Sequence, residues 1–577
     1  MKAPSVRALY RRLPRRFREV AWKAGEVAWK AVDQLPPAAQ RLFPHTDEHR
    51  RWQMQRLYKR TPPPLPDAPT VLFWIPGGME LMLHVETAIA AALQLRGYHV
   101  HAIICDAPYS ACVRREAEDG IAYEDWRAQC ARCISANRGV LDVMGIPYSS
   151  VGSFVSQEVR ESLWAQAEQV TPENVRELSH HGVSIGNNVI SSMIRYRRGY
   201  QLPDDDSILR QYAYTALITA ESARVAIGRF KASRVFMSHG IYVDWGPALH
   251  TALDLGVPIT TWKSSYLSAR FYMQQVKDHH LDFYRLKDEL WEVRAATPLT
   301  ADEERDLDAA LHTRYHKPVA FDVPELHREM GEKERFRAQY AIDPGKPVWG
   351  IMCHINWDSV ADYSPMAYPS FDEWTIDTIQ QALRNPDVQW LIKVHPVEAS
   401  YDRQVGVEKL IETRFPDLPP HVKMVPSAEK ISPFEFFDML DGGVTVYGTP
   451  GLELALAGKP VILAGEAHYG RKGFTHDAFD VASHRGLLSR AATFGPLTPD
   501  QKTLARRYAY SVFIQRQIPL PVVRDPDRLW WNLQHDKREQ LLPGADPFLD
   551  FICARIIDGG DFIMDRDLVK LAESDRW

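Results

Sequence analysis

The sequence has little cysteine and lacks any long uninterrupted apolar run. Six Cys residues among 577 are too few for a disulfide-stabilised scaffold, and this scarcity favours a reducing compartment, so the cytoplasm is the expected location. No stretch approaches the roughly 18 consecutive apolar residues of a membrane-spanning helix. The first thirty residues show no apolar core of a secretory signal. We therefore expect neither a spanning helix nor a secretory signal.

Also missing are the glycine spacing of a dinucleotide-binding loop and a complete metal-binding motif. The glycine pair that begins at Gly77 is not followed by the further glycines of that loop, which argues against NAD. Cys130 and Cys133 have CxxC spacing, and Cys105 and Cys112 precede them, but no second close pair exists. Zinc or a metal cluster is thus the alternative to buried free thiols. We assign neither a cofactor nor a metal.

What the sequence does contain is the composition of a packed globular protein. Hydrophobic residues make up 45% and charged residues 25%, and there are 16 Trp, which excludes wholesale disorder, collagen-like repeats and fibres. At about 150 residues per domain, a chain of this length predicts two to four domains.

The charge is unevenly distributed. The net charge is −5, but residues 1–60 hold fifteen Lys and Arg against five Asp and Glu, so the rest of the chain is acidic. Within residues 5–33, apolar residues recur every three or four positions among Arg and Lys, and Pro14 divides the pattern. Two basic amphipathic helices are predicted. Residues 1–33 either contact the surface of the inner membrane or dock on the body, and the acidic body argues against nucleic acid.

The remaining chain shows one architecture twice. Strand, helix and strand patterns follow one another in the first part, and similar units recur further along. In the first part the strands are predicted at 70–76, 98–105, 234–238 and 257–262, and the helices at 79–95, 171–178, 183–196, 208–230 and 246–254. In the second part the strands are predicted at 348–353, 388–394, 422–425, 443–447 and 460–464, and the helices at 371–383, 433–440 and 451–456. Parallel strands joined by crossover helices predict doubly wound sheets.

The predicted fold class is therefore α/β, with two Rossmann-like domains facing a cleft. A basic helical extension precedes them, and further helices follow from about residue 500. The expected segments are the extension 1–60, a Pro-rich linker 61–69, the two domains 70–343 and 344–500, and the C-terminal helices 501–577.

In open α/β sheets, ligands bind beyond the carboxyl ends of the strands, so residues that follow strands are the candidate site residues. Lys393 and His395 end one predicted strand, and a His there is placed to donate to a phosphate oxygen. Thr449, Gly451 and Glu453 lie where a strand turns into a helix, which is a favourable place for an anion.

Three further strand ends carry polar residues. Arg471 and Lys472 lie in a loop after a strand and form an adjacent pair of cations. His239 and Asp244 follow the predicted strand 234–238 and are the candidate catalytic residues that provide a general base, because neutral imidazole is commonly poised near pH 7. A third loop, with Asn356 and Asp358, is expected to face the same cleft; the ordinary alternative at each place is a solvated loop or a helix cap.

Three strings in the second part resemble the capsule polysaccharide biosynthesis family, which includes the bacterial Kdo transferases of capsule assembly. They are WLIKVHPVE, which ends at Glu398, YGTPGLELALAGKPVILAGEAHYGRKGFT, from Tyr447 to Thr475, and more loosely INWDS, from Ile355 to Ser359. Members of that family resemble two-domain glycosyltransferases of the GT-B type, which need no divalent metal.

The resemblance implies roles for individual residues. His395 and Thr449 would hold the donor phosphate, Glu453 the ribose, and Arg471 with Lys472 the phosphate or the carboxylate of an acidic sugar. A His-Pro motif with a downstream hydroxyl residue is shared with sialyltransferase-like enzymes that use CMP-sugars. A CMP-linked acidic sugar is therefore the expected donor class.

The function implied is a glycosyltransferase of surface (capsular) polysaccharide biosynthesis. The domain 344–500 would bind the nucleotide-sugar donor, and 70–343 would bind a polysaccharide or glycolipid acceptor and supply His239 as the base. The alternatives are a sugar-nucleotide epimerase or glycerophosphotransferase on the same fold, or a non-catalytic partner in polysaccharide assembly or export.

Overall fold

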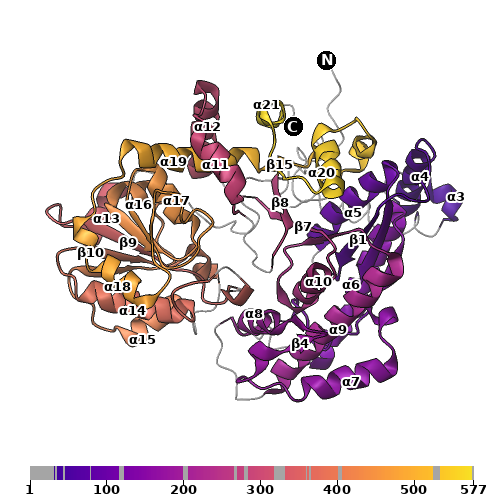
Figure 1. Ribbon diagram of the computed structural model, residues 1–577, viewed down its shortest axis with the longest axis horizontal. Helices are drawn as coiled ribbons and strands as arrows, with labels where there is room; N and C mark the ends of the chain where they lie inside the picture. The colour runs from indigo at the N-terminus through magenta and orange to yellow at the C-terminus, as the bar shows by residue number, and fades with distance from the viewer. Residues whose placement is uncertain are drawn as a thin grey trace, which may run out of the picture.

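The computed structural model describes residues 32, 35–42, 46–77, 80–115, 123–198, 206–265, 270–278, 284–316, 332–358, 360–362, 365–400, 406–523 and 533–574. Apart from residue 32, the basic segment 1–33 lies outside these residues, and so do the amphipathic helices predicted in it. The described chain forms two lobes, each built around a sheet, which lie side by side in Figure 1.

The sheet of the first lobe has seven strands in the order β15-β8-β7-β6-β1-β2-β3. The strands are β1 (Thr70–Ile75), β2 (His99–Ile104), β3 (Tyr148–Ser150), β6 (Arg234–Ser238), β7 (Ile259–Ser264), β8 (Arg270–Val276) and β15 (Ile518–Pro519). From β3 to β7 all neighbours are parallel, whereas β8 and β15 are antiparallel additions at one edge. The strand order reverses between β1 and β6, which defines a topological switch point.

The sheet of the second lobe has six parallel strands in the order β11-β10-β9-β12-β13-β14. They are β9 (Val348–Met352), β10 (Gln389–Lys393), β11 (Val422–Val425), β12 (Gly442–Thr445), β13 (Val461–Leu463) and β14 (His476–Asp477). The switch point of this sheet lies between β9 and β12. Both sheets thus have the doubly wound order, and the predicted class of two Rossmann-like domains is confirmed.

Continuous apolar runs form the central strands β9 and β10 of the second sheet. Every residue of β9 is buried, and in β10 only the last residue, Lys393, is partly exposed. Parallel strands need this pattern because helices cover both faces of the sheet. Trp349 and Trp390 lie on the same face of neighbouring strands, with ring centroids 6.1 Å apart, and they form part of the core of the second lobe.

The first lobe contains helices that the sequence predicts, two that it does not, at 123–144 and 157–167, and a hairpin whose second strand replaces the start of the predicted helix 183–196. The helices and short strands are α5 (Glu80–Leu95), α6 (Tyr123–Met144), η2 (Val151–Phe154), α7 (Gln157–Ala167), η3 (Val175–Glu177), the hairpin β4 (Ser179–His180) and β5 (Val183–Ser184), α8 (Gly186–Arg197), α9 (Asp206–Phe230) and α10 (Tyr242–Asp254). The predicted helix 171–178 is wrong. Asn174 accepts a hydrogen bond from the Thr171 N–H and closes a turn there, leaving only the 3-10 turn η3. The helix predicted at 246–254 begins earlier, at Tyr242.

Three helices of the second lobe lie close to where the sequence predicts them, at 371–383, 433–439 and 449–456, whereas the helices at 407–414 and 481–488 were not predicted. The helices of this lobe are η4 (Val360–Asp362), α14 (Phe371–Leu383), η5 (Pro396–Ser400), α15 (Val407–Arg414), α16 (Pro433–Met439), α17 (Thr449–Leu456), α18 (Val481–Leu488) and η6 (Ala491–Thr493). Several of these begin with a capping side chain or a proline in the first turn. Ser370 caps α14, Asp480 caps α18, and Pro433 opens α16.

The chain passes between the lobes twice. After β8 it forms α11 (Asp288–Ala296), α12 (Ala301–His316) and α13 (Lys333–Gln339), which pack on the second lobe and on α19 (Pro499–Tyr510). From α19 it returns through η7 (Ser511–Gln515), β15, η8 (Pro521–Val523), η9 (His535–Leu541), α20 (Pro547–Asp558) and α21 (Arg566–Glu573). Because β15 pairs with β8 and α20 packs on α5, the C-terminal part of the chain completes the first lobe.

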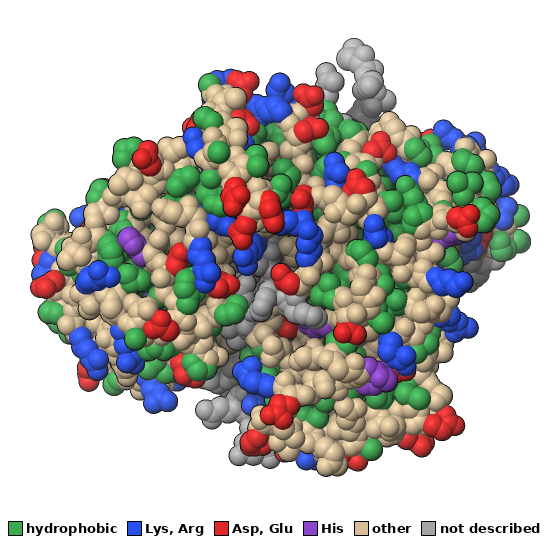
Figure 2. All heavy atoms as spheres, viewed as in Figure 1, with side chains coloured by type: hydrophobic (Ala, Val, Ile, Leu, Met, Phe, Trp, Pro, Cys, Tyr) green, Lys and Arg blue, Asp and Glu red, His purple; other side chains and the backbone are tan. Residues whose placement is uncertain are grey.

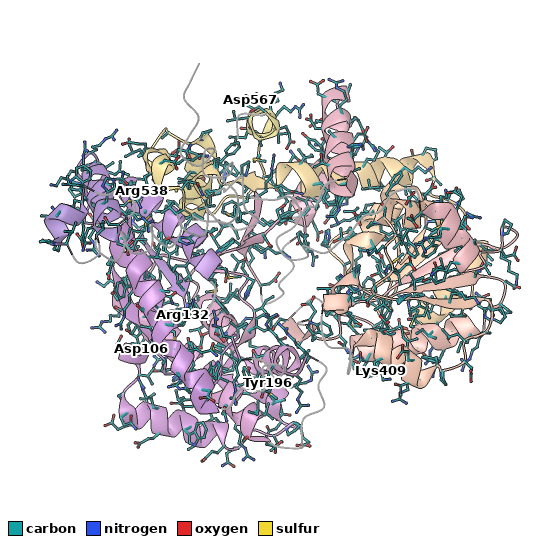
Figure 3. The ribbon with its side chains drawn as sticks, turned by 180° about the vertical axis from the view of Figure 1, so that it is seen from behind. Asp106, Arg132, Tyr196, Lys409, Arg538 and Asp567 are labelled. Atoms are coloured by element: carbon teal, nitrogen blue, oxygen red, sulfur yellow. The ribbon has the colours of Figure 1, made fainter. Side chains whose placement is uncertain are left out.

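Part of the predicted extension docks on the first lobe. After α3 (Pro37–Gln40), Thr46 caps α4 (Asp47–Tyr58), and the Tyr58 hydroxyl donates to the Met144 carbonyl oxygen at 2.8 Å. Arg538, labelled in Figure 3, donates to the Arg50 carbonyl oxygen at 2.8 Å. The C-terminal segment therefore holds α4 in place. Within the described residues, we find no helix with the length and apolarity needed to cross a membrane.

Candidate functional site

The carboxyl edges of the two sheets meet at Asp362. This residue ends η4, ten residues after β9, and its carboxylate accepts a hydrogen bond from the Asn188 side chain of α8 at 2.8 Å. It also accepts from the backbone N–H of Tyr242, which lies four residues after β6. Burial raises the pKa of Asp362 to about 7, against these hydrogen bonds. In the space-filling view the surface is hollowed between the lobes (Figure 2).

His354 fixes the loop at the switch point of the second sheet. It lies two residues after β9, and its Nε2 atom accepts the backbone N–H groups of Val446 and Tyr447, both at 3.2 Å. The Thr445 hydroxyl lies 3.1 Å from the same nitrogen. Burial, followed by the charge of the neighbouring His395, lowers the pKa of His354 to about 3. The ring is therefore neutral, and it holds the backbone that leads into α17.

The loop fixed in this way opens the N-terminus of α17. Thr449 is its first residue and is partly buried, as are the residues on either side. The Tyr469 hydroxyl donates to the Gly448 carbonyl oxygen at 2.5 Å, and a Cβ atom on Gly451 would lie 2.1 Å from that hydroxyl oxygen. Gly451 is thus required for close packing of the loop after β13. Pro450, the second residue of α17, has no N–H, and the Gly451 N–H donates to the Gly448 carbonyl oxygen at 3.0 Å.

His395 and Lys393 have different surroundings, although both lie at the end of β10. The Nδ1 atom of His395 accepts the Val397 N–H at 3.2 Å, so in the neutral ring Nε2 carries the proton and can donate. Burial and the charge of Lys393 lower the pKa of His395 to about 4, and its side chain is partly exposed. Lys393 instead donates to the carbonyl oxygens of Val394 and Pro426, both at 3.3 Å.

Glu453 is buried one turn into α17 and is paired with a residue of α12. Its Oε1 atom accepts from Arg314 Nε at 2.6 Å, and the side chain is 4% exposed. The sequence resemblance implies that Glu453 contacts a ribose. The carboxylate would have to make that contact while it also pairs with Arg314.

Arg471 and Lys472 point to different partners. Arg471 has a φ of 56°, is largely exposed, and pairs with Glu466 at 2.9 Å while its guanidinium covers Phe479. Lys472 is buried, and its Nζ atom lies 2.8 Å from Asp288 of α11. Both cations are thus neutralised by neighbouring carboxylates, and neither has a hydrogen bond to the loop that begins α17.

His239 and Asp244 do not form a pair. The Nδ1 atom of His239 accepts the Ile241 N–H at 3.0 Å, so Nε2 carries the proton, and burial with nearby cations lowers its pKa to about 3. The Asp244 carboxylate accepts the Val113 N–H at 3.2 and 3.3 Å instead. In this arrangement His239 is a hydrogen-bond donor at Nε2, whereas a general base would need an unprotonated nitrogen there.

Asp244 belongs to a separate small cavity, of about 40 Å³, which also contains the cysteines noted in the sequence. Cys105, Cys112, Cys130 and Cys133 all line it as free thiols. Burial raises the pKa of Asp244 to about 7 and raises the pKa of Cys105 and Cys112 above the ordinary value. No three of these sulfur atoms lie within 4.8 Å of one another, so the thiols do not form a preassembled metal site.

Asn356 and Asp358 lie in the turn that follows His354. Asn356 donates to the carboxylate of Asp372 in the first turn of α14, and the Asp358 N–H donates to the Ile355 carbonyl oxygen at 3.2 Å. Both residues are partly buried. Their described contacts shape the turn.

Sequence reasoning missed His354, Asp362, Asn188, Tyr469 and Arg314. His354 lies two residues after β9, the same signal that selected His395, so the strand-end rule could have found it. Asn188 and Arg314 lie 174 and 139 residues from their partners, so no local signal could have found them.

Comparison with known proteins identifies the central segment of the second lobe. Residues 362–487, which include His395 and Thr449, match the family model described as capsule polysaccharide biosynthesis protein. This segment belongs to the capsule polysaccharide biosynthesis family. The match covers two of the three strings that carry the resemblance in the sequence, whereas the INWDS string lies before it. No curated protein sequence matches the chain.

The solved structures that overlap this chain are distant in sequence. The beta Kdo 2,4 transferase KpsC of Thermosulfurimonas dismutans is 15% identical, over 54% of this chain and 87% of its own, with a TM-score of 0.32. The beta Kdo 2,7 transferase KpsC of the same organism is 11% identical, over 56% and 88%, with a TM-score of 0.31. The UDP-GlcNAc 2-epimerase from Neisseria meningitidis, bound to UDP-GlcNAc, is 10% identical, over 77% and 96%, with a TM-score of 0.24. These overlaps are too loose to assign any residue of this chain.

Proposed function

We propose that this chain is a glycosyltransferase of surface (capsular) polysaccharide biosynthesis. The donor would be a nucleotide-sugar bound at the carboxyl edge of the second sheet, and the acceptor a polysaccharide or glycolipid bound against the first. One observation carries the proposal. At the switch point between β9 and β12, His354 holds the backbone that begins α17, while His395, two residues after the adjacent strand β10, offers an Nε2–H.

These groups suit a departing nucleotide phosphate. The N-terminus of α17 offers the positive end of a helix dipole, and the Thr449 hydroxyl and the His395 Nε2–H can donate to phosphate oxygens. Fixed donors of this kind stabilise the charge that develops on the leaving group without reorganising. We therefore propose a mechanism in which these protein donors, rather than a divalent metal, neutralise the phosphate.

The donor class that we propose is a CMP-linked acidic sugar. The support is the His-Pro pair at 395 and 396, followed downstream by the hydroxyl of Thr449, a pattern that resembles enzymes using CMP-sugars. Because Arg471 and Lys472 already pair with Glu466 and Asp288, recognition of the sugar carboxylate would need one of these pairs to open on binding.

Thermal-shift screening against CMP, CDP, UDP, GDP and ADP tests the donor site. A ligand at about 100 times its dissociation constant stabilises the native state by about 2.7 kcal/mol, which is readily measured as an increase in Tm. We expect the largest increase with CMP, its loss in His395→Ala, and its retention in His395→Gln, whose side-chain amide can replace the Nε2 donor.

The other outcomes separate the alternatives. Preference for UDP or GDP would retain the transferase and reject the acidic-sugar donor, and conversion of UDP-GlcNAc without an acceptor would favour an epimerase. If no nucleotide changes Tm, in the wild type or the variants, the transferase proposal fails in favour of a non-catalytic partner in polysaccharide assembly.

We further propose that the protein acts in the cytoplasm at the inner membrane, attached through the basic segment 1–33. Co-flotation with vesicles that contain anionic lipid, for the full chain and for a chain lacking residues 1–33, tests this attachment. Equal flotation of the two chains would reject it.

A further inference from the structure

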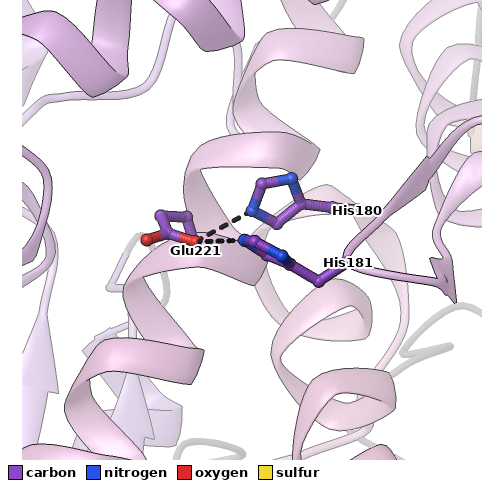
Figure 4. A group of neighbouring side chains, drawn as sticks. All are labelled: His180, His181 and Glu221. Atoms are coloured by element: carbon purple, nitrogen blue, oxygen red, sulfur yellow. Dashed lines mark hydrogen bonds and ion pairs between the residues drawn. The ribbon is translucent and has the colours of Figure 1, made fainter.

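Two consecutive histidines and a glutamate converge on one point of the first lobe, away from the site described above. The Nε2 atoms of His180 and His181 lie 2.9 and 3.3 Å from the same carboxylate oxygen, Oε2 of Glu221 (Figure 4). His180 ends β4, His181 lies in the following turn, and Glu221 projects from the middle of α9. Among the residues that the structure describes, this is the one group of three or more His, Cys, Asp or Glu ligand atoms that lie within 4.8 Å of one another.

The backbone explains how neighbouring residues reach one point. Successive side chains of a strand point to opposite faces, so two consecutive histidines in β4 would diverge. His181 instead has a φ of 50°, and Gly182 has a φ of 85°. This left-handed pair turns the chain between β4 and β5 and brings both rings to the same side. A positive φ is uncommon for a residue with a side chain, although His tolerates it better than most.

We propose that His180, His181 and Glu221 bind a divalent transition metal ion such as Zn²⁺, with a fourth position left for water or an external ligand. Two imidazoles and a carboxylate are an established donor set for this ion, at bond lengths of about 2.0–2.2 Å. In a tetrahedral site such bonds place the ligand atoms roughly 3.4 Å apart. The observed separations of 2.9 and 3.3 Å need only a small outward movement of the two rings.

The charges around the group suit a metal cation, except that the positively charged Arg224 also contacts Glu221. Glu221 is 7% exposed, and Arg224 donates to its Oε1 at 2.6 Å and to its Oε2 at 3.0 Å. Although burial opposes it, the hydrogen bonds from Arg224 and His180 keep the pKa of Glu221 below its ordinary value, so the carboxylate is ionised. Burial lowers the pKa of His180, which keeps the imidazole in the neutral form that binds metals. With Oε2 on the metal, Arg224 retains Oε1 as a hydrogen bond that orients the carboxylate.

The bound ion would link the hairpin of β4 and β5 to α9. Besides the contact of the histidines with Glu221, the side chain of Gln166 on α7 donates to the Ser179 carbonyl oxygen at 3.1 Å. The chain continues from this hairpin directly into α8, which carries Asn188. Metal binding is therefore expected to stabilise this part of the lobe and to raise Tm.

Titration of the untagged full-length protein tests the site. After treatment with a chelator, we expect one equivalent of Zn²⁺ or Co²⁺ to bind, with a Co²⁺ spectrum that lacks thiolate charge-transfer absorption. The double variant His180→Ala/His181→Ala should lose this equivalent, and Glu221→Gln should bind at least tenfold more weakly. The matched control is Cys130→Ser/Cys133→Ser, which should bind like the wild type.

The single variant His181→Ala keeps the test decisive if the others fail to fold, because His181 is 55% exposed and its removal is expected to leave the fold intact. It should retain the metal-free Tm of the wild type and lose most of the metal-dependent increase. Wild-type metal binding by His181→Ala, loss of binding in the cysteine variant, or no binding by the wild type would each overturn the proposal.

Discussion

Asn188 of the first lobe donates a buried hydrogen bond of 2.8 Å to Asp362 of the second lobe. The bond connects α8 to η4, which follow different sheets, and Asp362 also accepts the N–H of Tyr242 at the carboxyl end of β6. A titratable carboxyl group thus lies at a contact between the two lobes.

Stability should fall as the pH rises through the titration of Asp362. The pKa is about 7 in the folded chain against an ordinary value of 3.8, so between these values the folded state binds the proton more tightly. The stabilisation is complete below about pH 4 and is lost by about pH 7. Asp362→Asn, which mimics the protonated form, should gain stability over the wild type across this window, by a few kcal/mol at most.

The measurement is Tm against pH for both chains, because their difference removes the effect of other buried acids such as Glu86, whose pKa is raised by burial to about 8. A constant difference between pH 4 and 8 would contradict the assigned role of Asp362.

Replacing His354 should weaken nucleotide binding without contact between His354 and the nucleotide. His354→Leu leaves the N–H groups of Val446 and Tyr447 without their acceptor, which costs about 1–3 kcal/mol for buried groups. His354→Gln retains an acceptor at a similar position and should recover most of the loss. Isothermal titration with the nucleotide that raises Tm most would measure this difference, and equal affinities for the two variants would show that the hydrogen bonds are unimportant.

Two substitutions distinguish whether His239 acts as a general base or as a hydrogen-bond donor. His239→Ala removes both functions, whereas His239→Gln retains a donor close to the Nε2 position. If His239 is a base, both variants should lose about 10²–10⁴-fold in kcat, because general-base catalysis contributes that much. The observed hydrogen bond from the Ile241 N–H to Nδ1 favours the donor, so we expect His239→Gln to keep a far larger share of kcat than His239→Ala. Transfer assays with a fixed acceptor would decide between them.

The ion pair between Arg314 and Glu453 should contribute to stability through its burial. Arg314→Met leaves a carboxylate that is 4% exposed without its counter-charge, which costs about 3–5 kcal/mol when a buried pair loses one partner. The double change Arg314→Met/Glu453→Leu should cost much less than the sum of the single changes. Urea unfolding of the four chains gives the coupling, and strictly additive effects would argue against the pair.

Gly451 should tolerate no side chain while Tyr469 is present. In Gly451→Ala the new methyl group would lie 2.1 Å from the Tyr469 hydroxyl oxygen, and relieving this overlap is expected to cost about 1–3 kcal/mol. Adding Tyr469→Phe removes that oxygen and should restore part of the stability, measured by urea unfolding. A fully additive pair would mean that the strain lies elsewhere.

Much of the fold is predictable because each central strand can be identified from its own residues and those next to it in the sequence. Apolar runs such as 348–352 and 389–393, separated by helical stretches and turn residues, are sufficient to predict parallel strands and their crossovers. The hairpin of β4 and β5 was missed because its two strands are two residues long and its turn depends on a left-handed His181.

Some of the candidate site residues could be selected from the sequence, because they lie close to the ends of strands. His395 and Thr449 lie two and four residues after the ends of β10 and β12, so the strand-end rule selects them as candidates. The partners of Glu453, Lys472 and Asp362 lie on elements distant in sequence, so the ion pairs and the contact between lobes follow only from the tertiary arrangement.

The late position of β15 in the chain affects the order of events during synthesis. The second sheet spans residues 348–477 and can close once that stretch has emerged, whereas β8 receives its neighbour only when residues 518–519 appear. During synthesis the first lobe therefore exposes the unpaired backbone of β8 until residues 518–519 emerge. The second lobe can fold during this interval. The exposed edge of β8 can pair with foreign strands, so chains terminated before residue 518 are expected to be captured by chaperones or to aggregate.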